Sequence, residues 1–160
     1  MLVTLQTALP RPEKGGRPTL KEYMNKVRGA GPGEIGRWYR RSFGATSPAR
    51  FWHYWNPLYG YYLSYFVFKP LSRLLPRAIA LYLTFLVCGF VAHDLLVWAI
   101  AREPRFPIFA VLFSLFAAEV IVTEAVGFNL AGRPFALRVV ANVGFLAAAI
   151  AGAGLVEMML

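Results

Sequence analysis

The sequence predicts an all-α integral membrane protein, in which about three transmembrane helices follow a basic irregular arm and an aromatic interfacial or re-entrant segment. The first observation is composition. Of the 160 residues, 58% are hydrophobic and 16% are charged, with a mean hydropathy of +0.49, whereas soluble domains carry about 25% charged residues. The second observation is that apolar stretches long enough to cross a bilayer fill the C-terminal half. The third is that the positive charge gathers near the N-terminus, which is typical of a juxtamembrane segment.

Residues 1–36 form the predicted basic arm, which is rich in Gly, Pro and charge. Residues 1–50 hold ten Lys/Arg and three Glu, so they carry +7 of the net +9. We expect an irregular chain with one or two helical turns around Leu20–Val27. A basic segment beside an apolar body favours contact with anionic lipid headgroups or a partner protein, and disfavours nucleic acid.

Residues 37–77 form the predicted aromatic segment. The stretch from Phe51 to Pro70 is dense in Phe, Trp and Tyr, and Lys69 is its one formal charge. Pro57 and Gly60 interrupt any early helix. Because Trp and Tyr favour the boundary between lipid and water, the segment is expected to lie at the interface or to dip in as a re-entrant element.

Residues 78–160 form the predicted transmembrane domain. Its spanning segments are expected at Ala78–Ala101, Phe106–Phe128 and Phe135–Leu160, each with the roughly 20 residues that a helix needs to cross a bilayer. If the N-terminus is cytoplasmic, fifteen Lys/Arg lie inside and only Arg102 and Arg105 lie outside. The positive-inside rule therefore predicts a cytoplasmic N-terminus and a C-terminus on the opposite side.

Ionisable residues within the spanning segments are the candidates for function, because they are costly in hydrocarbon. They are His93 and Asp94 on the first segment and Glu119 and Glu124 on the second. The two glutamates are five residues apart, which predicts that they lie on different helix faces, and their role stays open. A lone histidine in a helix is more often structural than catalytic, but a neutral imidazole can act as a general base, and the sequence pattern around His93 makes it the leading candidate.

The surroundings of His93 carry a resemblance that covers about residues 47–98. The pattern comprises Phe51-Trp52-x-x-Trp55-Asn56, Phe66-Val67-x-x-Pro70, Thr84-Phe85 and Gly89-x-x-x-His93-Asp94. As a constellation it resembles the C-terminal catalytic-motif portion of the membrane-bound O-acyltransferase (MBOAT) family, in which a Trp-Asn or Trp-His element precedes an intramembrane histidine by a few tens of residues.

The resemblance implies a site and a reaction. His93 matches the family's catalytic histidine, and Asn56 matches the asparagine of the preceding element. The implied reaction is acyl transfer from an acyl thioester to a hydroxyl acceptor, with His93 as general base. It needs no metal and no cofactor beyond the thioester cosubstrate. Because family members are much longer than this chain, the resemblance also implies that another chain completes the site.

Two other functions stay open. The chain can be a non-catalytic accessory subunit, derived from an acyltransferase, of a larger respiratory or photosynthetic membrane complex. It can also ligate a haem or a chlorophyll through His93 or His53, since buried membrane histidines are common ligands. A face of small residues on the third segment, Gly144, Ala148 and Gly152, favours close helix approach. The expected partners are therefore membrane lipids and other transmembrane chains.

Overall fold

The computed structural model describes residues 17–29 and 31–159, and the elements of this part of the chain are all helical. In chain order they are α1 (Leu20–Arg28), α2 (Glu34–Phe43), α3 (Pro48–Tyr54), α4 (Pro57–Tyr62), the π-helical η1 (Leu63–Phe68), α5 (Lys69–Leu71), α6 (Arg77–Gly89), the π-helical η2 (Phe90–Asp94), α7 (Leu95–Ala101), α8 (Ile108–Ala125) and α9 (Phe135–Met158).

Within the part of the chain that the structure describes, three helices are long and apolar enough to cross a membrane. The first runs unbroken through α6, η2 and α7 from Arg77 to Ala101, and the others are α8 and α9. This confirms the predicted fold class, an all-α membrane protein with three spanning helices. The second span is shorter than expected. Pro107 precedes its first residue, and Gly127, at φ +68°, follows its end.

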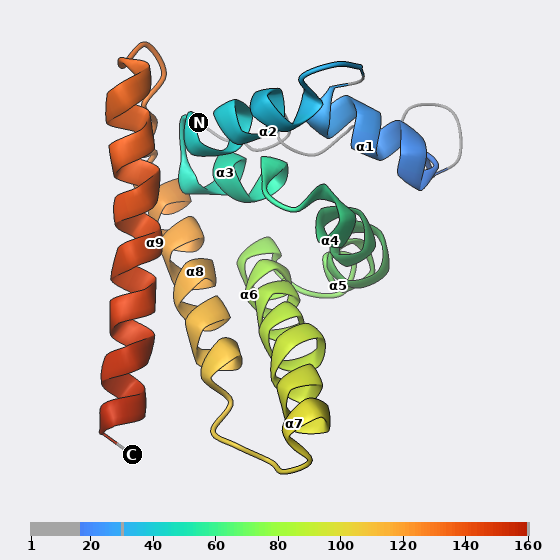
Figure 1. The fold of residues 1–160 in the computed structure, drawn as a ribbon, viewed down its shortest axis with the longest axis vertical. Coiled ribbons are helices and arrows are strands. Elements are labelled where there is room, and N and C mark those ends of the chain that lie inside the picture. The colour runs from blue at the N-terminus through green and yellow to red at the C-terminus, as the bar shows by residue number, and fades with distance from the viewer. Residues whose placement is uncertain (1–16, 30, 160) are drawn as a thin grey trace.

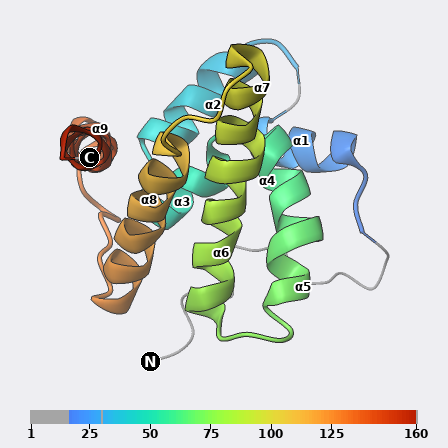
Figure 2. The same ribbon diagram turned by 90° about the horizontal axis from the view of Figure 1, so that it is seen from below.

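The spanning helices form an antiparallel series. In Figure 1, α9 follows the long axis, while α6–α7 and α8 form a hairpin beside it whose connecting loop lies at the end away from α1–α3. Figure 2 looks along α9 nearly end-on and shows α6–α7 and α8 slanting across the view. The three helices are therefore tilted relative to one another, which is usual for membrane bundles.

Gly89 permits the closest approach in this bundle. A methyl group added there would overlap the Phe109 carbonyl oxygen of α8 and crowd Phe113, whereas one added to Gly144 of α9 would meet nothing within 4 Å. We expect Gly89→Ala to lower the free energy of unfolding by about 1–3 kcal/mol. Gly144→Ala should raise it by about 0.5–1 kcal/mol through helix propensity. Denaturation in mixed micelles measures both, and shifts of the same sign would contradict this assignment of Gly89.

The described part of the predicted arm is mostly helical, not irregular. A capping box begins α1: Thr19 Oγ1 accepts from Glu22 N, and Glu22 Oε2 accepts from Thr19 N at 2.7 Å. The guanidinium of Arg41 donates to the Val27 carbonyl at 2.8 Å and so joins α2 to the end of α1. The expected boundary at residues 36 and 37 lies within α2, and the arm's first sixteen residues lie outside the described part of the chain.

The aromatic segment contains no span among its described residues. Residues 57–71 form one continuous helix through α4, η1 and α5, about 22 Å long at 1.5 Å per residue, which is shorter than the roughly 30 Å hydrocarbon core. This helix runs across the direction of α9, because Figure 1 shows it end-on and Figure 2 shows it from the side. Tyr61 packs with Tyr23 and Val27 in a buried cluster that docks α1 on it.

A polar clasp joins α9 to the helices at the basic end. Asn142 is 3% exposed, and its Nδ2 donates to the carbonyls of Phe43, Ala45 and Arg138, each at 2.9 Å. Phe43 is the last residue of α2, and Ala45 lies in the connection between α2 and α3. Because an unpaired carbonyl is costly in a dry interior, this clasp holds the α2–α3 turn against the third span.

Candidate functional site

A cavity of about 200 Å³ lies between the aromatic segment and the first two spanning helices. Both residues singled out by the family resemblance, Asn56 and His93, lie in its wall, although they are 37 positions apart. Its other lining residues include Trp52, His53 and Trp55 from α3 and its end, Tyr59 from α4, Ser64 and Phe68 from η1, Arg77, Phe85 and Cys88 from α6, and Phe113 and Glu124 from α8. The wall is thus rich in aromatic rings and also carries several polar groups.

His93 is held by its backbone and by aromatic rings. It lies in the π-helical segment η2, and its Nδ1 is 2.8 Å from the Cys88 carbonyl oxygen. Because a carbonyl only accepts, Nδ1 carries the proton and Nε2 of the neutral ring keeps its lone pair. The imidazole packs against Tyr59, Phe109 and Phe113, with ring centroids 5.8, 5.3 and 5.0 Å away. The ring therefore has a defined orientation and a basic nitrogen.

Asn56 has a structural role as well as a place in the cavity wall. It adopts a left-handed conformation with φ +42° and caps α4, since its Oδ1 accepts from Tyr59 N at 3.4 Å. Asparagine tolerates this conformation better than most residues. The Nδ2 group makes no hydrogen bond to the described residues and remains a donor for a bound molecule. Tyr59 connects the two candidates, because its N–H binds Asn56 and its ring packs on His93.

Asp94 points away from the cavity and caps the second span. It is 2% exposed, and its carboxylate accepts from Phe109 N at 3.0 Å and from Ala110 N at 2.7 Å. These are free N–H groups at the start of α8, where a negative charge is favourable. Gly89 and Asp94 of the family-like motif thus dock α8, while His93 between them faces the cavity.

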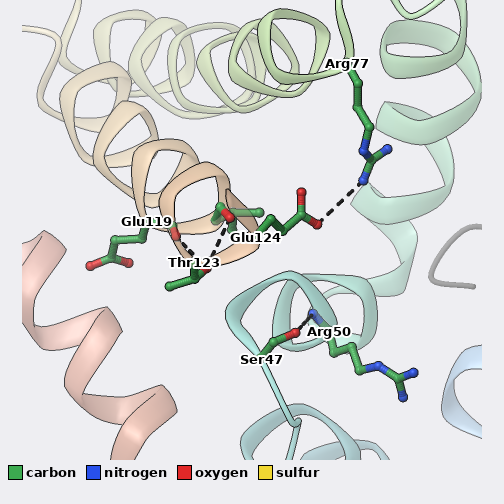
Figure 3. Close-up of polar contacts among 7 residues, drawn as sticks. Ser47, Arg50, Arg77, Glu119, Thr123 and Glu124 are labelled. Atoms are coloured by element: carbon green, nitrogen blue, oxygen red, sulfur yellow. Dashed lines mark hydrogen bonds and ion pairs between the residues drawn. The ribbon is translucent and has the colours of Figure 1, made fainter. Parts of the chain in front are cut away.

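The cavity has a charged end formed by Arg77 and Glu124. Arg77 begins α6, Glu124 lies near the end of α8, and Arg77 Nη2 is 3.6 Å from Glu124 Oε1. Figure 3 shows this contact and shows Glu119 on another side of α8. The expectation that the two glutamates occupy different faces is therefore confirmed. Glu119 does not line the cavity.

His53 is the second histidine of the cavity wall. Burial lowers the pKa of His53, and the nearby charges of Arg50 and Lys26 lower it further, so the ring is neutral at pH 7. Two histidines in one cavity would suit a metalloporphyrin in their chemistry. The cavity of about 200 Å³ does not enclose a whole porphyrin, since pockets for drug-sized ligands measure roughly 300–1,000 Å³. Haem or chlorophyll ligation by His53 or His93 therefore stays a prediction that would need a second chain.

Sequence reasoning missed Tyr59, Arg77 and Cys88 as cavity residues. Tyr59 is one tyrosine among many in its segment. Arg77 contributes only to the charge count that predicts the orientation in the membrane. Cys88 contacts His93 through its backbone carbonyl, a contact that any residue type can make.

Comparison with known proteins finds no matching family model, no matching curated protein and no matching solved structure.

Proposed function

We propose that this chain transfers an acyl group from a thioester to a hydroxyl acceptor in the cavity, as the resemblance to the MBOAT family implies. The observation that carries the proposal is the joint presence of His93 and Asn56 in one cavity wall, with His93 Nδ1 bound to a backbone carbonyl. This arrangement leaves Nε2 as the proton acceptor, and a base fixed in one tautomer is what general base catalysis needs.

In the proposed reaction His93 Nε2 takes the proton of the acceptor hydroxyl as its oxygen attacks the thioester carbonyl. The amide of Asn56 donates to the oxyanion that develops on that carbonyl. The C–S bond then breaks, and the thiolate leaves with the proton from the imidazolium. The products are an ester and a free thiol. The aromatic wall around His93 excludes water, which would otherwise compete as an acceptor.

We further propose that a second chain completes this site. The cavity is too small to enclose a whole acyl thioester, and only 22%, 28% and 17% of the three candidate spans is buried within the chain. The same exposed surface supports the second candidate function, a non-catalytic subunit of a larger membrane complex. In either case membrane lipids and other spanning chains are the partners.

The proposed orientation places the N-terminus in the cytoplasm. It is supported by the arrangement in Figure 1, in which α1–α3 and the start of α9 lie at one end and the loop after α7 lies at the other. That loop contains Arg102 and Arg105, and their charge is partly offset by Glu103, which is ion-paired with Arg105 at 2.6 Å. The basic end therefore faces the cytoplasmic leaflet under the positive-inside rule.

Acyl transfer by gently purified protein, with any co-purifying chain retained, tests the proposal. In vesicles with a labelled acyl thioester and membrane hydroxyl acceptors, the wild type should form a labelled ester, identified by mass spectrometry. Asn56→Asp keeps the oxygen that caps α4 but removes the amide donor, so it should lower kcat about 10²–10³-fold. No ester from either the single chain or the native complex would exclude the enzyme and favour the accessory subunit.

A further inference from the structure

The charged end of the cavity has unused binding capacity. A guanidinium carries five N–H donors and a carboxylate can accept about four hydrogen bonds. Within the described residues, the polar contact between the Arg77 and Glu124 side chains is a single one, at 3.6 Å. Charge-assisted hydrogen bonds are usually about 2.7–2.9 Å long, so this contact is too long to satisfy the pair. Arg77 Nε is buried and has no partner among the described residues.

The neighbouring side chains hold the Arg77–Glu124 pair in place but do not satisfy its remaining hydrogen-bond donors and acceptors. The Arg77 guanidinium lies over the Phe68 ring, 5.4 Å from its centroid. The Glu124 side chain is 16% exposed and that of Arg77 is 36% exposed, so the pair is buried mainly on the side of the carboxylate. A partly buried ion pair recovers its desolvation cost only when its remaining donors and acceptors are also bonded. A bound molecule that supplies these hydrogen bonds therefore gains more binding free energy here than it would at a solvated surface.

The pair lies at one end of a largely aromatic cavity. Leu81, Phe85 and Trp52 line the wall beyond it, and the start of α6 and the end of α8 are on the same side of the bundle as α1–α3. The cavity thus offers a charged end on the side of the basic helices and an apolar continuation beside it.

The two signs of charge select the ligand. A phosphate fits the planar guanidinium of Arg77 with two parallel hydrogen bonds. Glu124, a few ångströms away, repels a second negative charge but attracts an ammonium group. His53 is neutral at pH 7, so it does not alter this balance. We propose that the charged end of the cavity binds a zwitterionic phosphate amphiphile, with its phosphate on Arg77 and its ammonium on Glu124. This inference does not depend on chemistry at His93.

Binding of single-chain lipids to the purified full chain in neutral detergent tests the inference. The probes are lysophosphatidylethanolamine and lysophosphatidic acid with the same brominated chain, which quenches tryptophans such as Trp52 and Trp55 in the cavity wall. The wild type should bind the zwitterion at least about tenfold more tightly than the anion. Soluble phosphoethanolamine should bind at least about tenfold more weakly than the lipid, because it buries no chain.

The variants separate the two charges. Glu124→Gln should abolish the preference for the zwitterion, and Arg77→Gln should weaken binding of both lipids about tenfold or more. Arg73→Gln and Glu103→Gln, at exposed positions outside the cavity lining, are the matched controls and should change neither. The ratio of the two affinities is measured on one preparation, so it does not depend on the folded fraction. Equal binding of both lipids by the wild type, or an unchanged ratio in Glu124→Gln, would overturn the inference.

Discussion

Replacing His93 by glutamine should lower kcat for acyl transfer by about 10²–10⁴-fold, the usual contribution of a general base. Glutamine retains an N–H group that can donate to the Cys88 carbonyl, which now accepts from His93 Nδ1 at 2.8 Å. It has no nitrogen that can accept the hydroxyl proton. The variant therefore removes the base while it preserves the polar contact in the first span. Steady-state kinetics in reconstituted vesicles, with the acceptor varied, measures the effect.

His53 provides the matched control, because it is the second histidine of the same cavity wall. Its ring packs beside Tyr54 and away from the shelf formed by Tyr59, Phe109 and Phe113. His53→Gln should leave kcat within about twofold, since the proposed reaction uses no group of His53 and glutamine keeps a polar side chain there. A similar loss in both variants would mean that the cavity needs its shape rather than a base, and would refute the role of His93.

The spanning helices could be predicted because hydropathy is a property of the local sequence. The observed first and third spans begin within one residue of their predicted starts. The arm was harder to predict. Ile35, Trp38 and Tyr39 repeat with helical spacing in α2. Gly29 and Gly33, at the two ends of the connection between α1 and α2, are instead typical of an irregular chain. In the folded protein these glycines are left-handed residues between two docked helices, with φ +83° and +77°.

The cavity could be predicted only in part. The resemblance to the MBOAT family implied that Asn56 and His93 belong to one site, and the structure brings both into one wall. Nothing in the spacing indicates that Glu124 lies beside Arg77, because that contact depends on how α6 and α8 cross. For the same reason, the sequence does not indicate that Asp94 caps α8. Its hydrogen-bond partners are backbone N–H groups fifteen and sixteen residues away, which carry no side-chain signature.

Asp94→Ala should cause the largest loss of stability of any single substitution in the bundle, about 3–6 kcal/mol. Each of the two hydrogen bonds to the carboxylate contributes roughly 1.5–3 kcal/mol. Without them, Phe109 N and Ala110 N at the start of α8 have no partner in a region where water is scarce. Asp94→Asn keeps one acceptor oxygen and should lose about half as much. Denaturant titration in mixed micelles, followed by tryptophan fluorescence, measures the free energy of unfolding.

The two substitutions at neighbouring positions should separate chemistry from folding. His93→Gln should reduce turnover with a change in unfolding free energy below about 1 kcal/mol, since it keeps a donor to Cys88. Asp94→Ala should reduce both, because Phe109 and Phe113 on α8 form the shelf for the His93 ring. Glu103→Gln, which is exposed in the loop between the first two spans, is the control for loss of an acidic charge. If Asp94→Ala unfolds at the same denaturant concentration as Glu103→Gln, the carboxylate does not hold α8, and the position of the aromatic shelf must depend on packing, such as that at Gly89 and around Phe113.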